Sequence, residues 1–181
     1  WFAQKLRGQL AAKLGYQAIE MDDENGTSWY IVPGVESIPL NEEADPSTPD
    51  AYNQGPAGQL PEYITVDGVE RPTTNSKGLP IHPTEEGVRN FWRWFGDSKV
   101  VDEQGRPLVV YHGTLADFSS PKINSRLGFF VTTVADYANS YADPTGYGNK
   151  KQIPPGNVMP LYAKVKNPLS FRQFVEFEAN L

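Results

Sequence analysis

The sequence predicts an α+β fold in which helices and strands follow one another in mixed order. Two observations support this prediction. Apolar residues recur at helical spacing in residues 1–14 and 84–95, and short runs rich in β-branched and aromatic residues between them are typical of strands. A chain of 181 residues can bury roughly 70% of the surface that it exposes when unfolded. No disulfide or metal is therefore needed to stabilise it.

The N-terminal part predicts a helix followed by a hairpin. Residues 1–14 are expected to be helical because apolar side chains recur every four residues. These side chains are Phe2, Leu6, Leu10 and Leu14. Two strands are expected over residues 16–21 and 29–32, because the Asn-Gly pair at 25–26 between them is a strong hairpin signal.

Residues 41–83 differ from the rest of the chain in composition. They contain seven prolines and many Asn, Ser, Thr and Gly residues, and only residues 63–66 are typical of a strand. We interpret the segment as a linker without a core of its own. The chain is then divided into a segment 1–40, a linker 41–83 and a second segment 84–181.

The second segment predicts further helices and strands. Thr84 is suited to cap a helix whose first turn carries Glu85 and Glu86. Their negative charges interact favourably with the positive end of the helix dipole. Its apolar face consists of Val88, Phe91, Trp92 and Phe95. The remaining elements are expected to be strands at 100–102, 108–111 and 128–131, a helix capped by Thr133, a strand at 161–165 and a helix that begins at Ser170.

Composition excludes several classes of site. The chain has no cysteine, so thiol catalysis and thiolate metal sites are excluded. His82 and His112 are its two histidines, which excludes a multi-histidine metal site, and we expect no metal. The net charge of −6 argues against nonspecific binding to DNA or to an anionic membrane. No run approaches the roughly 20 apolar residues of a membrane helix.

Two clusters of residues suit a binding site. His112 ends an expected strand and is followed by Gly113, which lets a ligand approach the backbone; a histidine that only caps a turn is the alternative. Phe129 and Phe130 lie in the next strand, and Tyr141 lies on the following helix. Such aromatic residues usually belong to a core, but they can also stack on a flat cationic ring.

Both clusters lie in segments that resemble a known family. The segments are WFGDSKVVD at 94–102, GRPLVVYHGT at 105–114, GFF at 128–130 and ANSY at 138–141. Together they resemble the front half of an ADP-ribosyltransferase domain of the kind found in polyvalent proteins of phages and prophages. The broader class is the branch of diphtheria toxin and the poly(ADP-ribose) polymerases, which has a histidine–tyrosine–glutamate triad.

This resemblance implies a split two-sheet ADP-ribosyltransferase-like fold, with NAD as a substrate. It implies that His112 is the catalytic histidine of the triad, which holds the nicotinamide-side ribose. Gly113 and Thr114 complete the His-Gly-Thr block that binds NAD. Phe130 matches the position of the triad tyrosine, and Tyr141 matches the second aromatic residue around the nicotinamide.

The closing part of the same family resembles the N-terminal segment of this chain. LGYQAI at 14–19 and SWYIV at 28–32 resemble its last strands, so the chain has the order tail, linker, head. Three arrangements explain this order. The domain is circularly permuted, the chain is a slice across two tandem domains, or a second copy or a parent polyprotein completes each half. We expect residues 16–32 and 108–131 to lie in one sheet, because each half alone has too few strands.

Two positions depart from the family pattern. Trp29 stands where the family has its catalytic glutamate, and Phe130 lacks the hydroxyl group of the triad tyrosine. The acidic residues near Trp29 are interpreted as a solvated hairpin and its flanks. They are Glu20, Asp22, Asp23, Glu24 and Glu36.

These departures leave the enzyme assignment open. One hypothesis is an NAD-dependent transferase that passes ADP-ribose to a macromolecular target, protein or nucleic acid. The alternative is a catalytically degenerate NAD-binding or protein-interaction module of a larger phage protein, and a third hypothesis is an interaction module that binds no nucleotide. The resemblance implies the host cytoplasm as location, or association with the virion and delivery with the phage, and no membrane partner.

Overall fold

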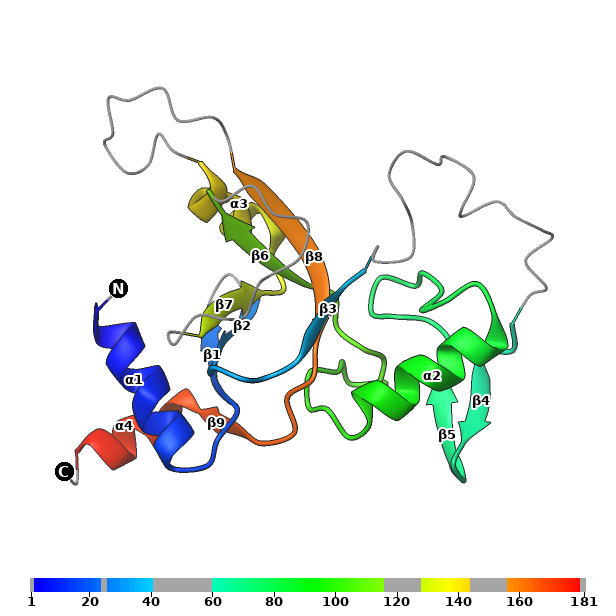
Figure 1. Cartoon of the computed structure of the whole chain (residues 1–181), viewed down its shortest axis with the longest axis horizontal. Helices are drawn as coiled ribbons and strands as arrows, with labels where there is room; N and C mark the ends of the chain where they lie inside the picture. Colours follow the sequence, from blue (N-terminus) through cyan, green and yellow to red (C-terminus); the bar gives the residue numbers. More distant parts are fainter. Residues whose placement is uncertain (1, 24–25, 41–59, 116–127, 144–155, 180–181) are drawn as a thin grey trace.

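The computed structural model describes residues 2–23, 26–40, 60–115, 128–143 and 156–179 (Figure 1). In chain order the elements are α1 (Phe2–Lys13), β1 (Ala18–Asp23), β2 (Gly26–Ile31), β3 (Ser37–Pro39), β4 (Tyr63–Val66), β5 (Val69–Pro72), α2 (Glu85–Phe95), β6 (Val110–Thr114), β7 (Phe129–Thr132), α3 (Ala135–Ala142), β8 (Asn157–Ala163), β9 (Pro168–Ser170) and α4 (Phe171–Glu178). Helices and strands are mixed along the chain, as the α+β prediction requires. No helix within these ranges is long and apolar enough to cross a membrane.

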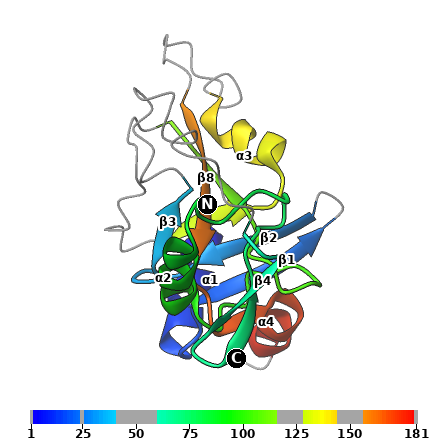
Figure 2. The same ribbon diagram turned by 90° about the vertical axis from the view of Figure 1, so that its right-hand side faces the viewer.

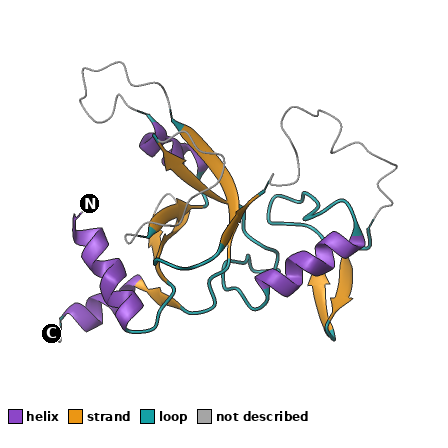
Figure 3. Ribbon diagram, viewed as in Figure 1, coloured by secondary structure: helices purple, strands orange, loops and turns teal. Residues whose placement is uncertain are grey.

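A curled seven-stranded sheet forms the centre of the structure, with helices at its periphery (Figures 1 and 3). Its strand order is β3-β8-β6-β7-β2-β1-β9. The seven strands form one continuous sheet and not the two separate sheets that were expected. The sheet is continuous, but its two parts meet at a narrow junction. There β6 pairs with β7 through Tyr111 and Thr132, whereas β6 pairs with β8 along its whole length.

Residues from the two ends of the chain lie side by side in this sheet. Strand β2 pairs with β7 in antiparallel register, so that Tyr30 lies opposite Phe130. Strand β3 pairs with β8, which places Ile38 opposite Tyr162. The expectation that residues 16–32 and 108–131 share one sheet is therefore confirmed. Permutation, a tandem slice and completion by another chain remain predictions.

The N-terminal helix, the hairpin and the capped helices α2 and α4 form where the sequence predicts them. The Thr84 side chain accepts a hydrogen bond from the Gly87 amide, and all four residues of the predicted apolar face of α2 are buried. Ser170 and Gln173 form a capping box at α4, as the start at Ser170 requires.

Some expected elements differ in the structure. Thr133 does not cap α3, because its hydroxyl group donates to the Thr27 carbonyl oxygen and Val134 takes the N-cap position. The strands expected at 100–102 and 108–111 reduce to a bridge between Val101 and Pro107, followed by β6. Strand β9 was not expected; it lies parallel to β1, at the edge of the sheet.

Part of the segment predicted as a linker is ordered. Residues 41–59 lie outside the described residues, but residues 60–83 contain the hairpin of β4 and β5. Ile64 and Val66 of this hairpin are buried in a cluster with α2, so residues 60–83 pack in a core that they share with α2. Figure 2 shows this unit in front of the sheet, with α3 at the far end of β8. The domain boundaries at 40 and 83 stay predictions.

Candidate functional site

Three neighbouring strands bear the positions that the sequence resemblance assigns to the triad. His112 lies in β6, Phe130 in β7 and Trp29 in β2, and these strands are adjacent in the order β6-β7-β2. Trp29 lies opposite Val131, the residue after Phe130. Strand pairing between the N-terminal segment and the second segment thus brings Trp29 beside the strands of Phe130 and His112.

His112 lies at the narrow junction between β6 and β7. Its Nδ1 atom is 2.8 Å from the carbonyl oxygen of Phe130. Because a carbonyl oxygen only accepts hydrogen bonds, Nδ1 is the donor, and Nε2 of the neutral ring is left as an acceptor. Burial lowers the pKa of His112 below its ordinary value, against the opposing effect of the bond to Phe130. The imidazole is therefore neutral at pH 7.

An aromatic cluster forms where β7 faces α3. The Phe130 ring lies 5.7 Å from the Tyr141 ring and 5.9 Å from the Tyr137 ring, between centroids. Tyr141 is 37% exposed, so the cluster reaches the surface. The structure thus brings Phe130 and Tyr141 together as the resemblance implies. It adds Tyr137, whose spacing of four residues from Tyr141 on one helix is the signal that could have identified it.

Gly113 contacts α3 instead of opening onto a cavity. A Cβ atom at this position would lie 1.7 Å from the carbonyl oxygen of Ala138 and 3.3 Å from the Cβ atom of Tyr141. The absence of a side chain thus lets α3 approach β6 and places Tyr141 beside Gly113. Thr114 follows at the end of β6, opposite Asn157 of β8. Contacts of Gly113 and Thr114 with NAD stay a prediction.

Trp29 is buried and holds an acidic side chain in place. It is 2% exposed, and its indole Nε1 donates a hydrogen bond of 2.9 Å to Oε2 of Glu20. Glu20 lies directly opposite Trp29 in β1 and is half-buried, whereas Asp22, two residues further along β1, is exposed. The sequence interpretation of Glu20 as part of a solvated hairpin missed this contact.

The other candidate acids lie elsewhere. Glu36 accepts hydrogen bonds from Lys164 Nζ at 2.9 Å and from Trp94 Nε1 at 3.1 Å. The hydrogen bond from Lys164 and its charge lower the pKa of Glu36. This contact ties the N-terminal segment to β8 and α2. Asp23 ends β1, and Glu24 lies outside the described residues.

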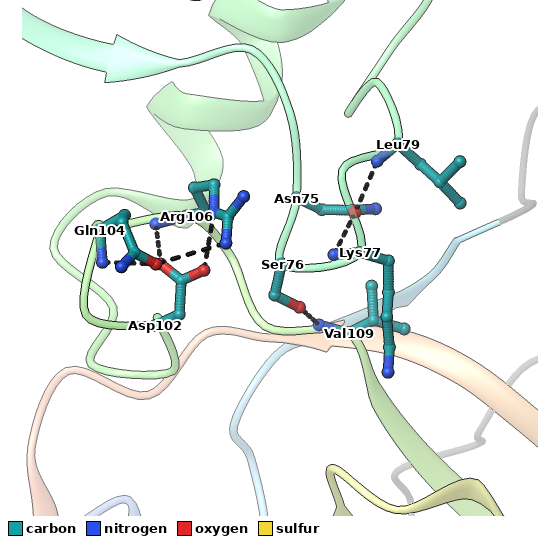
Figure 4. A network of polar contacts seen from close by, with 8 residues as sticks. All are labelled: Asn75, Ser76, Lys77, Leu79, Asp102, Gln104, Arg106 and Val109. Atoms are coloured by element: carbon teal, nitrogen blue, oxygen red, sulfur yellow. Dashed lines mark hydrogen bonds and ion pairs between the residues drawn. The ribbon is translucent and has the colours of Figure 1, made fainter.

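A shallow cavity of about 350 Å³ lies away from these residues. It is lined by Ser76, Lys77, Asp102, Glu103, Gln104, Arg106, Leu108, Val109 and Thr133. The Asp102 carboxylate there accepts hydrogen bonds from the Gln104 and Arg106 amides and from Arg106 Nε (Figure 4). The charged side chains therefore stabilise their own turn. No group of three or more His, Asp or Glu side chains suited to a metal occurs within the described ranges.

The polar contacts beside this cavity position the strand that leads to His112. Asn75 accepts hydrogen bonds from the Lys77 and Leu79 amides, and Ser76 Oγ accepts one of 3.1 Å from the Val109 amide (Figure 4). Asn75 Nδ2 also donates to the Tyr162 hydroxyl group in β8. The described part of the predicted linker, residues 60–83, thus supports β6 and β8 from one side.

Comparisons with protein families match both ends of the chain. The family model described as "ADP-Ribosyltransferase in polyvalent proteins" matches residues 102–179. The model described as "Anti-CRISPR Type I-F ADP-ribosyltransferase AcrIF11" matches residues 1–38. Searches of curated proteins and of solved structures gave no significant match. Both descriptions name enzymes that transfer ADP-ribose, a reaction in which NAD is the donor.

Proposed function

We propose that this chain, an ADP-ribosyltransferase domain of phage type, binds NAD beside His112, Phe130 and Tyr141 and transfers its ADP-ribose to a macromolecular target. The observation that carries the proposal is the arrangement of the triad positions. His112, Phe130 and Trp29 lie on three adjacent strands, although Trp29 belongs to the N-terminal segment and the other two belong to the second segment.

The aromatic cluster suits the nicotinamide end of NAD. The oxidised nicotinamide ring is flat and positively charged, so an aromatic face attracts it by about 0.5–2 kcal/mol. Tyr141 is the exposed member of the cluster, and Phe130 supports it from β7. The neutral imidazole of His112 has Nε2 available as an acceptor for a ribose hydroxyl group.

Transfer requires the bond between the ribose C1′ atom and the nicotinamide nitrogen to break. The electron pair of this bond leaves with nicotinamide, and the sugar develops oxocarbenium character. A carboxylate hydrogen-bonded to the ribose stabilises this charge electrostatically. An indole cannot accept such a hydrogen bond, so Trp29 cannot take the role of the family glutamate.

A specific observation favours a second candidate function. Trp29 and Phe130 replace two of the three triad residues, and the indole is buried in the sheet. A catalytically degenerate module that binds NAD or a protein partner without turnover is therefore the alternative. It keeps the aromatic cluster and His112 but releases no nicotinamide.

Binding and turnover measured on the same protein separate the two candidates. Calorimetric titration with NAD should show binding that Tyr141→Ala and His112→Ala each weaken at least tenfold. Exposed Phe171→Ala on α4 is the control and should bind normally. Chromatography of the NAD mixture then shows whether nicotinamide is released. Binding with release supports the transferase, binding without release supports the alternative, and unchanged binding by both site variants contradicts the proposed site.

Labelling with a biotinylated NAD analogue in a lysate of a bacterial host identifies the molecule that accepts ADP-ribose. Loss of the label on protease treatment identifies a protein acceptor, and loss on nuclease treatment identifies a nucleic acid. We propose the host cytoplasm as the place of this reaction, because the resemblance is to phage families. The net charge of −6 makes a specific contact with the acceptor more plausible than general attraction to nucleic acid.

A further inference from the structure

We infer that Tyr137 is a positioning residue of the proposed NAD site, where it holds the ring of Tyr141 in place for the nicotinamide. The inference rests on the proposed binding of NAD at Tyr141. The sequence resemblance assigns no role to Tyr137. This residue lies on α3 four positions before Tyr141, a spacing that places two side chains on the same face of a helix.

Three aromatic rings contact one another in the cluster of Phe130, Tyr137 and Tyr141. The Tyr137 ring lies 5.9 Å from the Phe130 ring and 5.7 Å from the Tyr141 ring, between centroids. Both contacts are close to perpendicular, with interplanar angles of 78° and 81°. Aromatic pairs favour this edge-to-face arrangement, because the positive edge of one ring meets the negative face of the other. Tyr137 therefore contacts both rings and restrains their orientation.

The ring of Tyr141 has no room for a nicotinamide on the side of Phe130. The two centroids lie 5.7 Å apart at an interplanar angle of 42°, so the rings are in direct contact. A ring stacked between them would need a separation of about 7–8 Å, twice the usual contact distance between carbon atoms. In the proposed site, nicotinamide therefore stacks on the exposed part of Tyr141, and Phe130 and Tyr137 support this ring from the protein side.

Backbone contacts of α3 fix the helix that bears both tyrosines. A Cβ atom at Gly113 would lie 1.7 Å from the carbonyl oxygen of Ala138, so α3 packs directly on the backbone of β6. The Ser140 hydroxyl group donates a hydrogen bond of 2.7 Å to the carbonyl oxygen of Tyr137. Because the backbone is held, the direction of the Tyr141 ring depends on its side-chain torsion angles, which the contact with Tyr137 restrains. Binding of nicotinamide then has less side-chain freedom to remove.

The ring of Tyr137, and not its hydroxyl group, makes the contact that orients Tyr141. The two hydroxyl oxygens lie 3.4 Å apart, which is longer than the usual 2.5–3.0 Å of an O–H···O hydrogen bond. A phenylalanine at position 137 would keep both edge-to-face contacts and lose only this long contact. A leucine would lose the aromatic contacts while keeping an apolar side chain of similar helix propensity.

The affinities of the full chain for NAD and for ADP-ribose test the inference. ADP-ribose lacks the nicotinamide, so its binding does not depend on the direction of the Tyr141 ring. We expect Tyr137→Leu to weaken NAD binding about three- to tenfold, the effect of ordering one side chain on binding, and to leave the ADP-ribose affinity within about twofold. Tyr137→Phe should bind both ligands like the wild type. Isothermal titration calorimetry measures the affinities, and thermal unfolding shows that each variant is folded at the temperature of the titration.

A double-mutant cycle separates positioning from a direct contact with NAD. Because Tyr137 acts through Tyr141, the variant that carries both Tyr137→Leu and Tyr141→Leu should bind NAD as Tyr141→Leu alone does. Tyr63→Leu is the matched control, since Tyr63 is an exposed tyrosine of the β4–β5 hairpin, and it should keep the wild-type affinity for both ligands. Losses that multiply in the double variant would show that Tyr137 contacts NAD itself and would overturn the positioning role.

Two further results would contradict the inference, and a third would also remove its premise. Equal losses of NAD and ADP-ribose affinity in Tyr137→Leu would show a purely structural role. Wild-type NAD affinity in Tyr137→Leu, together with weakened binding by Tyr141→Leu, would overturn the role of Tyr137 and leave the proposed NAD site standing. Wild-type NAD affinity in both single variants would overturn the proposed site as well.

Discussion

Nδ1 of His112 donates a hydrogen bond to the carbonyl oxygen of Phe130 at 2.8 Å, at the point where β6 and β7 meet through a single pair of residues. The contact links two positions of the family triad through a side chain. It fixes which ring nitrogen carries the proton, so Nε2 becomes the acceptor. In the proposed NAD site, this bond between two strands would also prepare the histidine to receive a ribose hydroxyl group.

The buried imidazole makes stability depend on pH. Burial lowers the pKa of His112 in the folded state, whereas the unfolded chain has the ordinary value near 6.5. The unfolded state therefore binds the proton first as the pH falls. Above pH 6.5 the imidazole is neutral in both states, so the free energy of unfolding does not depend on His112 titration. As the pH falls from 6.5 towards the lowered pKa of the folded state, the protein loses stability. The loss is at most about 1.4 kcal/mol per pH unit.

Urea unfolding between pH 7.5 and 5 measures this dependence. The Nδ2 atom of Asn can replace Nδ1 as the donor to Phe130 but does not titrate, so His112→Asn should lose less stability than the wild type below pH 6.5. The same slope for His112→Asn and the wild type would contradict the assignment.

Gly113→Ala should displace α3. The new Cβ atom would lie 1.7 Å from the backbone oxygen of Ala138, which cannot rotate away as a side chain can. Such overpacking typically costs about 1–3 kcal/mol and occasionally more. Gly68→Ala is the control, because Gly68 has open space around it but a positive φ of 83° and thus only conformational strain.

The readout for Gly113→Ala is the urea midpoint together with NAD affinity. Because Tyr141 lies beside Gly113, we expect this variant to lose both stability and NAD binding, while Gly68→Ala loses about 1 kcal/mol of stability and keeps its NAD affinity. A Gly113→Ala protein as stable as the wild type would show that α3 does not pack here as described.

Trp29→Glu restores the family residue but should destabilise the protein. Trp29 is 2% exposed, and truncation of a buried tryptophan typically costs about 3–5 kcal/mol. The new carboxylate would also be buried beside Glu20, the carboxylate that the indole now holds. Trp29→Phe, which keeps most of the packing and loses only the hydrogen bond, should cost markedly less. Equal urea midpoints for Trp29→Glu and the wild type would refute this expectation.

Local patterns in the sequence predicted the elements that local interactions determine. The apolar spacing of α2, its Thr84 cap and the start of α4 at Ser170 all depend on side chains within one or two helical turns. The resemblance of both segments to one family, together with the small number of strands in each, predicts that residues 16–32 and 108–131 lie in one sheet. The pairing of β2 with β7 confirms that expectation.

Local sequence patterns do not predict contacts between residues that are distant in the sequence. Proline-rich composition predicted a linker at 41–83, but Ile64 and Val66 are buried because α2 offers them an apolar face from outside the segment. The contact between Glu20 and Trp29 depends on the register of the hairpin, and a shift by one residue would turn the carboxylate to the other face. Sequence composition alone does not determine such a register.

The N-terminal segment 1–40 resembles the closing part of the family domain, and the segment 84–181 resembles its front part. We propose that a circular permutation of one domain explains this order. Strands β2 and β3 of the N-terminal segment pair with β7 and β8 of the second segment within one chain. Helices α1 and α4 lie side by side, since the Arg7 guanidinium group lies 5.6 Å from the centroid of the Phe174 ring (Figure 1). Residue 2 lies at the end of α1 that points away from α4, so a Gly/Ser linker from residue 179 to residue 2 must run back along α1, whose 12 residues span about 18 Å (Figure 1).

A reordered chain of residues 60–179, this linker and residues 2–40 should fold with a thermal midpoint within about 5 °C of the original, because every strand pair is retained and loop closure changes stability by less than about 1 kcal/mol. Its control carries Val131→Asp, which places a charge in the fully buried centre of β7 and should abolish folding in both orders. Circular dichroism and size-exclusion chromatography give the readout. A reordered chain that is unfolded, or that folds only as a dimer, would contradict permutation and favour completion of each half by a second chain.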